Sequence, residues 1–358
     1  MEFSSFTSYI ILPLIFLINL NLQNNTVTPA SRGRTLDPIE HICSQIRLLI
    51  DEVVKRNLTT GILFSGGLDT SIIAFVASKY SSLNAFTVAF ENAPALDLEY
   101  SKIMANLLKM DHKIHFFADE EMFSAIREVI KTLKVFDPME VRNSVAIFVG
   151  LTTAKENGVK GVMTGDGLDE LFAGYSWLFN LSESELISRL SNMWQTMLFS
   201  SIPMARSLGM EAKTPYLDSE FKSFAFSVDP KLKIRSEGGK TWGKWIIRKS
   251  FEGLLPDEIV WRLKSPIEFG SGTTVFPKFF GERISDEYFQ EKVKQYLEED
   301  QVSIRDKEQL FYYEIFRSVF GTPIKIFSKT KGKLCPYCKS KGGDEKSKFC
   351  RICGAYPI

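Results

Sequence analysis

The segment FSGGLDTS (residues 64–71) follows the apolar run GIL and combines two glycines, three hydroxyl side chains and one carboxylate. A strand that ends in glycines and leads into a helix aims several backbone N–H groups at one point, where the helix dipole adds positive charge. This arrangement favours a phosphate or pyrophosphate. Asp69 would repel such a ligand unless a cation lies between them. An ordinary strand–turn–helix junction would not need the Asp, and the segment is not a G-x-x-x-x-G-K-[ST] loop.

A second polar segment, GDGLDELFAGY (residues 165–175), places Asp166, Asp169 and Glu170 just past the apolar run GVMT. Carboxylates this close together are costly to ionise unless a cation or a basic substrate neutralises them. A solvated acidic turn is the plain alternative, but apolar residues flank the cluster on both sides. The segment therefore predicts a cation or substrate site rather than a surface turn.

Four of the five cysteines gather near the C-terminus in two C-x-x-C pairs, Cys335 with Cys338 and Cys350 with Cys353. This spacing is typical of a tetrahedral Cys₄ zinc site, and because all four ligand places are filled the Zn²⁺ would be structural. Two disulfides are the alternative in an oxidising compartment. The surrounding segment is rich in lysine, which indicates either an RNA or protein docking surface or a solvated face.

Strand and helix patterns alternate through the first half of the chain and position these segments. Apolar residues at helical spacing predict helices over residues 38–56, 70–80, 98–110, 120–133 and 143–158. Short apolar runs predict strands over residues 60–66, 84–90, 113–117 and 160–165. Such alternation predicts an α/β fold, a parallel sheet with helices on both faces. Ligands bind beyond the carboxyl ends of its strands, where both polar segments lie.

The rest of the chain divides into further regions. Helical patterning dominates residues 178–319, and residues 321–333 form a lysine-rich connector. We expect a hydrophobic extension and linker over residues 1–36, a catalytic domain over 37–322, and a connector with a zinc ribbon over 323–358. A net charge of +1 gives no global reason to expect binding to nucleic acid or membranes.

The loop S-G-G-x-D-[ST]-S resembles the signature of the ATP pyrophosphatase (PP-loop) enzymes, which cut ATP between the α and β phosphates. The second segment resembles the GEGADELFGGY string of asparagine synthetases and β-lactam synthetase. MEAKTPYLD (residues 210–218) is similar to their EARVPFLD stretch, and residues 243–272 resemble their K-x-x-L-R…LP-x-x-I-x-x-R-x-K region. The resemblance covers about residues 38–319 and implies the adenine nucleotide alpha hydrolase-like fold.

Carried over by position, the resemblance implies roles for named residues. The pyrophosphate of ATP would be bound by Ser65, Gly66, Gly67, Thr70 and Ser71. The adenosine would be bordered by Leu63, Val88 and Gly165. Mg²⁺ would be held by Asp69 and Asp169, with Lys244 and Arg248 adding positive charge near the phosphates.

The same resemblance implies the catalytic set. Asp166 takes the place of a glutamate that acts on substrate or nucleophile, and Glu170 is a further candidate carboxylate. Lys264 matches a lysine that stabilises charge during adenylylation and the following attack. The implied reaction converts aspartate, ATP and ammonia to asparagine, AMP and pyrophosphate. A PP-loop enzyme that modifies tRNA and binds RNA through the zinc ribbon is the alternative, and an inactive scaffold is a third hypothesis.

The sequence also departs from the family pattern. Glutamine-dependent members begin with a glutaminase domain whose first residue after Met is Cys, whereas position 2 here is Glu. We therefore expect free ammonia, another amine, or ammonia from a separate glutaminase partner. The basic stretch before EARVPFLD is replaced by SSIPMARSLG (residues 200–209), and Lys213 replaces Arg.

The apolar N-terminal segment (residues 8–22) is interrupted by Pro13, Asn19 and Asn21. It is short for a membrane span and lacks the preceding positive charge of a secretory signal. A signal peptide, a peripheral hydrophobic extension and a misassigned start remain open. We expect a cytoplasmic protein with no stable membrane partner.

Overall fold

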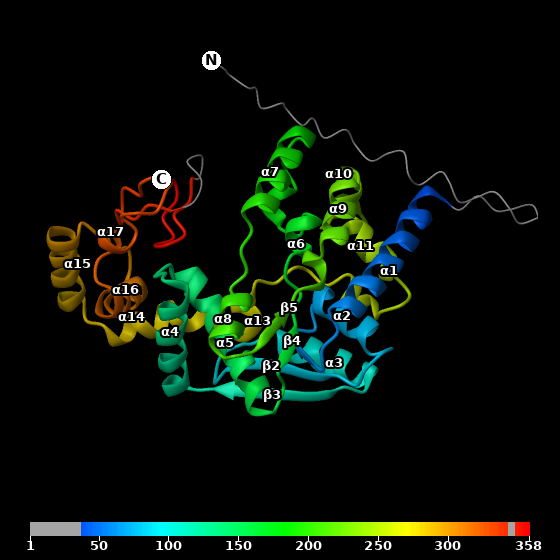
Figure 1. Ribbon diagram of the computed structural model, residues 1–358, viewed down its shortest axis with the longest axis horizontal. Coiled ribbons are helices and arrows are strands. Elements are labelled where there is room, and N and C mark those ends of the chain that lie inside the picture. Colours follow the sequence, from blue (N-terminus) through cyan, green and yellow to red (C-terminus); the bar gives the residue numbers. More distant parts are fainter. Residues whose placement is uncertain (1–36, 343–347) are drawn as a thin grey trace, which may run out of the picture. The chain divides into compact units, whose positions relative to one another are not determined.

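The computed structural model describes residues 37–342 and 348–358, so the predictions for residues 1–36 lie outside the described residues. Residues Pro38–Ile358 form one compact unit. At its centre is a parallel five-stranded sheet of order β3-β2-β1-β4-β5 (Figure 1). None of the described helices is long and apolar enough to cross a membrane.

The strands of the sheet are β1 (Gly61–Leu63), β2 (Asn84–Phe90), β3 (Asp111–Phe117), β4 (Gly161–Met163) and β5 (Glu211–Lys213). A separate antiparallel hairpin consists of β6 (Ile234–Glu237) and β7 (Lys240–Gly243). The helices up to β5 are α1 (Pro38–Arg56), α2 (Leu68–Ala77), α3 (Asp97–Leu108), α4 (Asp119–Leu133), α5 (Pro138–Glu156), α6 (Leu168–Leu171), η1 (Ser176–Leu178), α7 (Glu183–Thr196) and α8 (Ser201–Ser207). The later helices are η2 (Pro215–Leu217), α9 (Ser219–Ser227), α10 (Pro230–Lys233), α11 (Trp245–Phe251), α12 (Asp257–Val260), α13 (Ile267–Ser271), η3 (Thr273–Val275), α14 (Phe276–Arg283), α15 (Asp286–Asp300), α16 (Lys307–Phe320) and α17 (Pro323–Ile326).

The two faces of the sheet carry separate hydrophobic cores, because successive strand residues point in opposite directions. Phe86 and Val162 belong to the core formed with α4, α5, α14 and α16. Their neighbours Ala85 and Met163 belong to the core formed with α1, α2, α11 and α12. The predicted fold class, a parallel sheet with helices on both faces, is confirmed.

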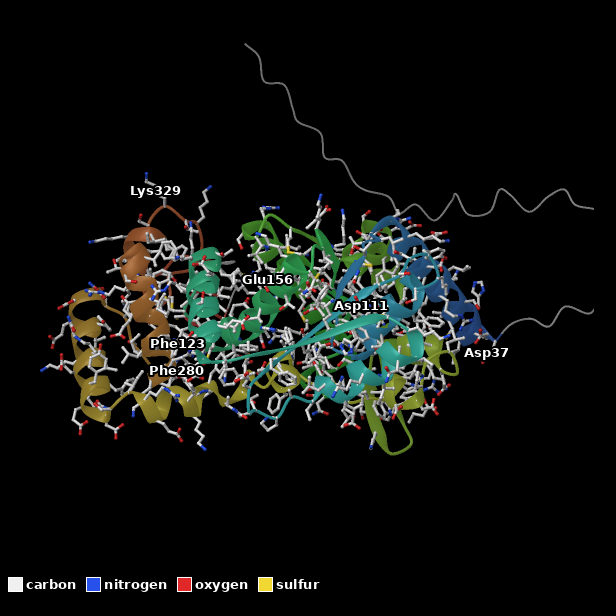
Figure 2. All side chains as sticks on the ribbon, turned by 90° about the horizontal axis from the view of Figure 1, so that it is seen from below. Asp37, Asp111, Phe123, Glu156, Phe280 and Lys329 are labelled. Atoms are coloured by element: carbon white, nitrogen blue, oxygen red, sulfur yellow. The ribbon has the colours of Figure 1, made fainter. Side chains whose placement is uncertain are left out.

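An aromatic cluster joins the C-terminal helices to the first core. Phe123 of α4 and Phe280 of α14 lie with ring centroids 6.3 Å apart (Figure 2). Phe311 of α16 stacks on Phe280 at 4.7 Å. These contacts place α14 and α16 against α4. The helical C-terminal region therefore packs on the helices that cover one face of the sheet.

Among the differences from the sequence-based expectation, two have clear physical reasons. Helix α5 begins at Pro138 rather than at residue 143, because the Asp137 side chain caps it by accepting from the N–H of Met139 at 3.3 Å. The region expected to be helical also contains β5 and the β6–β7 hairpin. Strand β5 completes the sheet edge beside β4, and the hairpin turns at Gly238 and Gly239, both with positive φ.

A buried carboxyl on α16 makes stability depend on pH. Burial of Glu308 raises its pKa to about 7 from 4.5, against the opposing effects of Arg142 and the Tyr312 hydroxyl, and Asp306 and Asp137 raise it further. The folded chain therefore binds more protons at Glu308 than the unfolded chain between these pH values, and the free energy of unfolding falls as pH rises through them. We expect Glu308→Gln to flatten the fall in melting temperature measured between about pH 5 and pH 8. An unchanged slope would contradict this origin.

Candidate active site

The two polar segments meet because their strands are neighbours in the sheet. Strands β1 and β4 are hydrogen-bonded side by side, with Ile62 opposite Met163. From β1 the chain proceeds toward β2 and β3 on one side, whereas β4 and β5 lie on the other. Such a reversal of strand order opens a crevice at the carboxyl ends of the strands. The loop before α2 and the loop before α6 both leave the sheet at this crevice.

The loop after β1 turns tightly at Gly66 and brings its polar groups together. Gly66 has φ +63°, and a methyl group there would overlap the backbone of Tyr100. The Ser65 hydroxyl accepts from the N–H of Gly67 at 3.1 Å and lies 3.1 Å from the Thr70 hydroxyl. Helix α2 follows immediately, so its N-terminus is aimed into the crevice.

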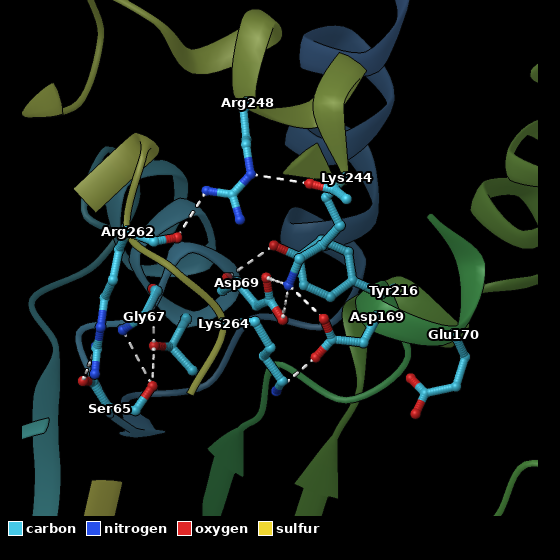
Figure 3. A network of polar contacts seen from close by, with 12 residues as sticks. Ser65, Gly67, Asp69, Asp169, Glu170, Tyr216, Lys244, Arg248, Arg262 and Lys264 are labelled. Carbon is cyan, nitrogen blue, oxygen red and sulfur yellow. Dashed lines mark hydrogen bonds and ion pairs between the residues drawn. The ribbon is translucent and has the colours of Figure 1, made fainter. Parts of the chain in front are cut away.

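Four charged side chains form the centre of the site (Figure 3). The Lys244 ammonium lies 2.7 Å from Oδ1 of Asp69 and 2.6 Å from Oδ1 of Asp169. The Lys264 ammonium lies 2.7 Å from Oδ2 of Asp169. The two carboxylates thus converge on one cationic group from the ends of two adjacent strands.

The environment affects the two carboxylates differently. Burial raises the pKa of Asp69, despite the attraction of Lys244. Burial also opposes ionisation of Asp169, but Lys244 and Lys264 together hold the pKa of that carboxyl below its usual range. Its anionic charge in turn raises the pKa of Lys264, although burial acts in the opposite direction. Asp169 is therefore the fixed negative charge of the centre.

Residues from distant segments support the loop. The Tyr216 hydroxyl donates to the carbonyl of Asp69 at 2.8 Å. The Arg262 guanidinium donates to the carbonyl of Ser65 at 3.3 Å (Figure 3). It also donates to Asp97 at 2.8 Å. Neither Arg262 nor Asp97 is among the predicted site residues. Arg262 stands two positions before Lys264 in a segment that already carried the resemblance, whereas Asp97 has no comparable sequence signal.

Asp166 and Glu170 line the same cavity. Oδ2 of Asp166 accepts from the Thr164 hydroxyl at 2.8 Å and from the Ser201 hydroxyl, and burial raises the pKa of Asp166. Glu170 accepts from the Tyr175 hydroxyl at 2.5 Å, and burial raises its pKa as well. Ser201 belongs to the segment that departs from the family pattern, and its contact with Asp166 is visible only in the fold.

Most of the predicted residues line a cavity of about 300 Å³. It is lined by Leu63, Ser65, Gly67, Asp69, Thr70, Val88, Gly165, Asp166, Asp169, Glu170, Lys244, Arg248 and Lys264. Gly66 and Ser71 stand outside this lining, Gly66 in the turn and Ser71 fully buried on α2. Arg248 donates from Nε to the carbonyl of Gly243 at 2.9 Å and from Nη1 to the carbonyls of Val260 and Arg262. Lys213 pairs with Glu211 on β5, away from the lining.

A substitution at Gly174 would test whether the site requires the observed position of the Asp169 carboxylate. A methyl group at Gly174 would overlap Oδ1 of Asp169, and the N–H of Gly174 donates to the carbonyl of Asp169 at 2.8 Å. The resemblance implies Mg²⁺ and ATP at this site, and on that basis we expect Gly174→Ala to weaken nucleotide binding by about tenfold or more, because the carboxylate must move. Isothermal titration with α,β-methylene-ATP measures this. Gly281→Ala is the matched control, since a methyl group there meets no atom within 4 Å. Equal affinities in the two variants would contradict the expectation.

The four C-terminal cysteines converge as well. The Sγ atoms of Cys335 and Cys353 are 3.7 Å apart, as are those of Cys338 and Cys350, and all four lie within 4.8 Å of one another. All four side chains are buried, and none of the cysteines is in a disulfide. Tetrahedral Zn²⁺ with bonds of about 2.3 Å to sulfur separates its ligands by about 3.8 Å. The donor set and its spacing therefore fit zinc.

Comparisons with known proteins identify relatives of the chain. The family model described as asparagine synthase matches residues 45–201 and 182–337. An asparagine synthetase [glutamine-hydrolyzing] of Sandersonia aurantiaca is 32% identical over 246 residues, covering 62% of this chain and 46% of that protein. Asparagine synthetase B [glutamine-hydrolyzing] of Escherichia coli is 28% identical over 308 residues, covering 78% and 54%.

The chain thus spans about half the length of these curated relatives. Among solved structures, an NMN synthetase from Francisella tularensis aligns over 84% of this chain and 99% of that chain. Its TM-score is 0.36 and its identity 11%, too low a similarity to assign a fold.

Proposed function

Because the chain belongs to the asparagine synthase family, we propose that it is an ATP-dependent ligase that adenylylates a carboxylate, releases pyrophosphate and transfers ammonia to form an amide. The observation that carries the proposal is the convergence of Asp69 and Asp169 from neighbouring strands at one cavity. One carboxylate follows a loop suited to pyrophosphate, and the other stands in a cluster suited to the acceptor. This pairing supports cleavage between the α and β phosphates.

In this mechanism the loop after β1 binds the leaving pyrophosphate. The N–H groups at the start of α2 and the hydroxyls of Ser65 and Thr70 provide hydrogen bonds to its oxygens. The carboxylates of Asp69 and Asp169 fit Mg²⁺, since both are anionic oxygen donors that already face one cationic group, Lys244. When bound, Mg²⁺ would neutralise the phosphate oxygens. Lys244, which lies between the two carboxylates, would add positive charge near the phosphates.

Lys264 and Asp166 are assigned to the acceptor end. The Lys264 side chain is 33% exposed, whereas that of Lys244 is 3% exposed, so Lys264 can reach a substrate. It would stabilise the charge that develops as the carboxylate oxygen attacks the α phosphorus and as ammonia attacks the acyl carbon. Asp166, whose pKa is raised by burial, would accept the proton from the attacking ammonia. Glu170, which accepts a hydrogen bond from Tyr175, would assist as a further carboxylate.

We propose aspartate as the acceptor and asparagine as the product, because asparagine synthetases are the relatives of the chain. The nitrogen would arrive as free ammonia or from a separate glutaminase partner. The comparisons do not favour the tRNA-modifying alternative, since the family model spans both polar segments.

The C-terminal cysteines would hold one structural Zn²⁺, which completes the proposed set of ions. Residues 37–322 would carry the reaction and residues 323–358 the connector and the metal-binding ribbon. A cytoplasmic location, where thiols stay reduced, belongs to the same proposal.

The experiment that tests the proposal is a screen for pyrophosphate release from ATP. The protein is incubated with Mg²⁺, ammonia and single amino acids, and separately with bulk tRNA. Aspartate-dependent release is expected. Release with a different amino acid would retain the reaction class and replace the substrate. Release with tRNA alone would overturn the proposal in favour of the modifying enzyme.

A further inference from the structure

The Cys₄ ribbon is joined to the catalytic unit through the backbone of its second knuckle. The carbonyl of Cys353 accepts from Nη2 of Arg305 and from Nε2 of Gln309, each at 2.8 Å. The carbonyl of Gly354 accepts from Nη1 of Arg305 at 2.9 Å. The N–H of Phe136 donates to the carbonyl of Ile352 at 2.8 Å. The carbonyls of three consecutive residues, Ile352, Cys353 and Gly354, therefore accept hydrogen bonds from residues outside the ribbon.

Two backbone hydrogen bonds close this knuckle around Cys350 and Cys353. The N–H of Gly354 donates to the carbonyl of Cys350 at 2.8 Å, and the N–H of Cys350 donates to the carbonyl of Ala355 at 2.9 Å. Gly354 has φ +74°, a region that favours glycine. A metal bound by Cys350 and Cys353 would fix this turn and so fix the direction of the three carbonyls.

The knuckle rests on the residue that starts helix α5. A methyl group at Gly354 would overlap Oδ1 of Asp137, the carboxylate that caps α5 through the N–H of Met139. Phe136, whose N–H holds the knuckle, is the preceding residue and is fully buried. The four cysteines also belong to the same hydrophobic core as Phe136. These contacts are those of an integrated part of the domain rather than of a tethered module.

Helix α5 connects this point to the nucleotide cavity. Its residues Ala146, Ile147 and Gly150 line the cavity. A methyl group at Gly150 would lie 3.1 Å from Leu63 and 3.7 Å from Val88, two of the three residues predicted to border the adenosine. The helix is thus held by the ribbon at its N-terminus and forms a wall of the cavity about 18 Å further along.

We propose that the metal-bound ribbon is a positioning element for the nucleotide site, which it acts on through the N-terminus of α5. Without the metal the knuckle loses its fixed turn, the cap of α5 loosens, and the wall formed by Gly150 becomes mobile. The metal takes no part in the chemistry because four thiolates fill its coordination. The effect on nucleotide binding rests on the proposed function, whereas the effect on α5 does not.

The test uses the full chain and compares three forms. They are the zinc-loaded protein, the protein stripped of zinc, and Arg305→Gln, which keeps all four cysteines but loses donors to Cys353 and Gly354. Arg206→Gln, an exposed arginine on α8, is the matched control. Bound zinc is measured by mass spectrometry, amide exchange is followed over residues 136–145, and affinity is measured for α,β-methylene-ATP.

We expect one zinc per chain in the loaded protein and in both variants. Amide exchange at the start of α5 should become at least about tenfold faster in Arg305→Gln and faster still in the stripped protein. Nucleotide affinity should fall in the same order, and Arg206→Gln should match the wild type. Since Arg305→Gln retains the metal, it remains informative if stripping unfolds the chain.

Three results would overturn the proposal. An ordered ribbon in protein that contains no zinc would show that the metal does not hold the knuckle. Faster exchange confined to residues 335–342 and 348–358 would make the ribbon an independent module. Faster amide exchange in α5 with unchanged nucleotide affinity would show that the ribbon affects the helix but not the nucleotide site. If the zinc-loaded wild type binds no nucleotide, the proposed function fails while the exchange result still decides the role of the ribbon.

Discussion

Asp169→Asn is expected to reduce the rate of pyrophosphate release from ATP by roughly 10²- to 10³-fold, the effect of losing one preorganised charge in an active site. Asp169 pairs with Lys244 at 2.6 Å and with Lys264 at 2.7 Å. An amide in its place leaves both ammonium groups facing the single carboxylate of Asp69. The substitution also removes one of the two anionic ligands proposed for Mg²⁺.

The control for this variant is Asp111→Asn. The Asp111 side chain is 62% exposed at the start of β3 (Figure 2) and lies outside the cavity lining. Removing a partner of a buried ion pair can cost about 3–5 kcal/mol of stability, so melting temperatures of both variants are measured first and rates are compared well below them. An Asp169→Asn protein that is folded and as fast as Asp111→Asn would contradict the assignment.

Lys264→Met is expected to lower kcat for pyrophosphate release by about 10²-fold with little change in KM for ATP. Lys264 is bound to Asp169 but remains partly exposed to the cavity, where it is also 5.9 Å from the Tyr175 ring. Its charge would act mainly on the transition state, since the loop after β1 is the proposed binding site for the phosphates of ATP. Methionine keeps most of the side-chain volume and removes the charge.

Steady-state kinetics separate the two roles that Lys264 could have. Lys278→Met is the matched control, because the Lys278 side chain is 81% exposed on α14 and lies outside the cavity lining. A Lys264→Met protein with unchanged kcat and a raised KM for ATP would show that this lysine binds nucleotide in the ground state. That result would remove Lys264 from the catalytic set.

Much of the sheet could be predicted from local pattern. The helix over residues 38–56 coincides with α1, because its apolar residues recur at helical spacing. The strand over residues 84–90 coincides with β2, because it is a short, mostly apolar run. Strand β5 has only three residues and no alternation, so its conformation results from pairing with β4 rather than from its own sequence. The hairpin around Gly238 and Gly239 carried a turn signal, but helical patterning on both sides obscured it.

The candidate site could be predicted in part. Asp69 and Asp169 follow strands that the pattern identified, so their meeting at one sheet edge follows from the fold class. The position of Lys244 between them does not, since it depends on how α11 packs across the strand ends. Ser201 and Asp97 were missed for the same reason. Each comes from a segment whose place is set by tertiary packing, and neither side chain stands in a motif.

The most direct test of the central claim is an isotope-transfer experiment. The protein is incubated with ATP, Mg²⁺, ammonia and aspartate whose side-chain carboxylate is labelled with ¹⁸O, and the nucleotide product is analysed by mass spectrometry. Adenylylation predicts that the product is AMP carrying one ¹⁸O, because the carboxylate oxygen that attacks the α phosphorus leaves with AMP when the amide forms. ADP as the product, or AMP without the label, would contradict activation of the carboxylate by adenylylation.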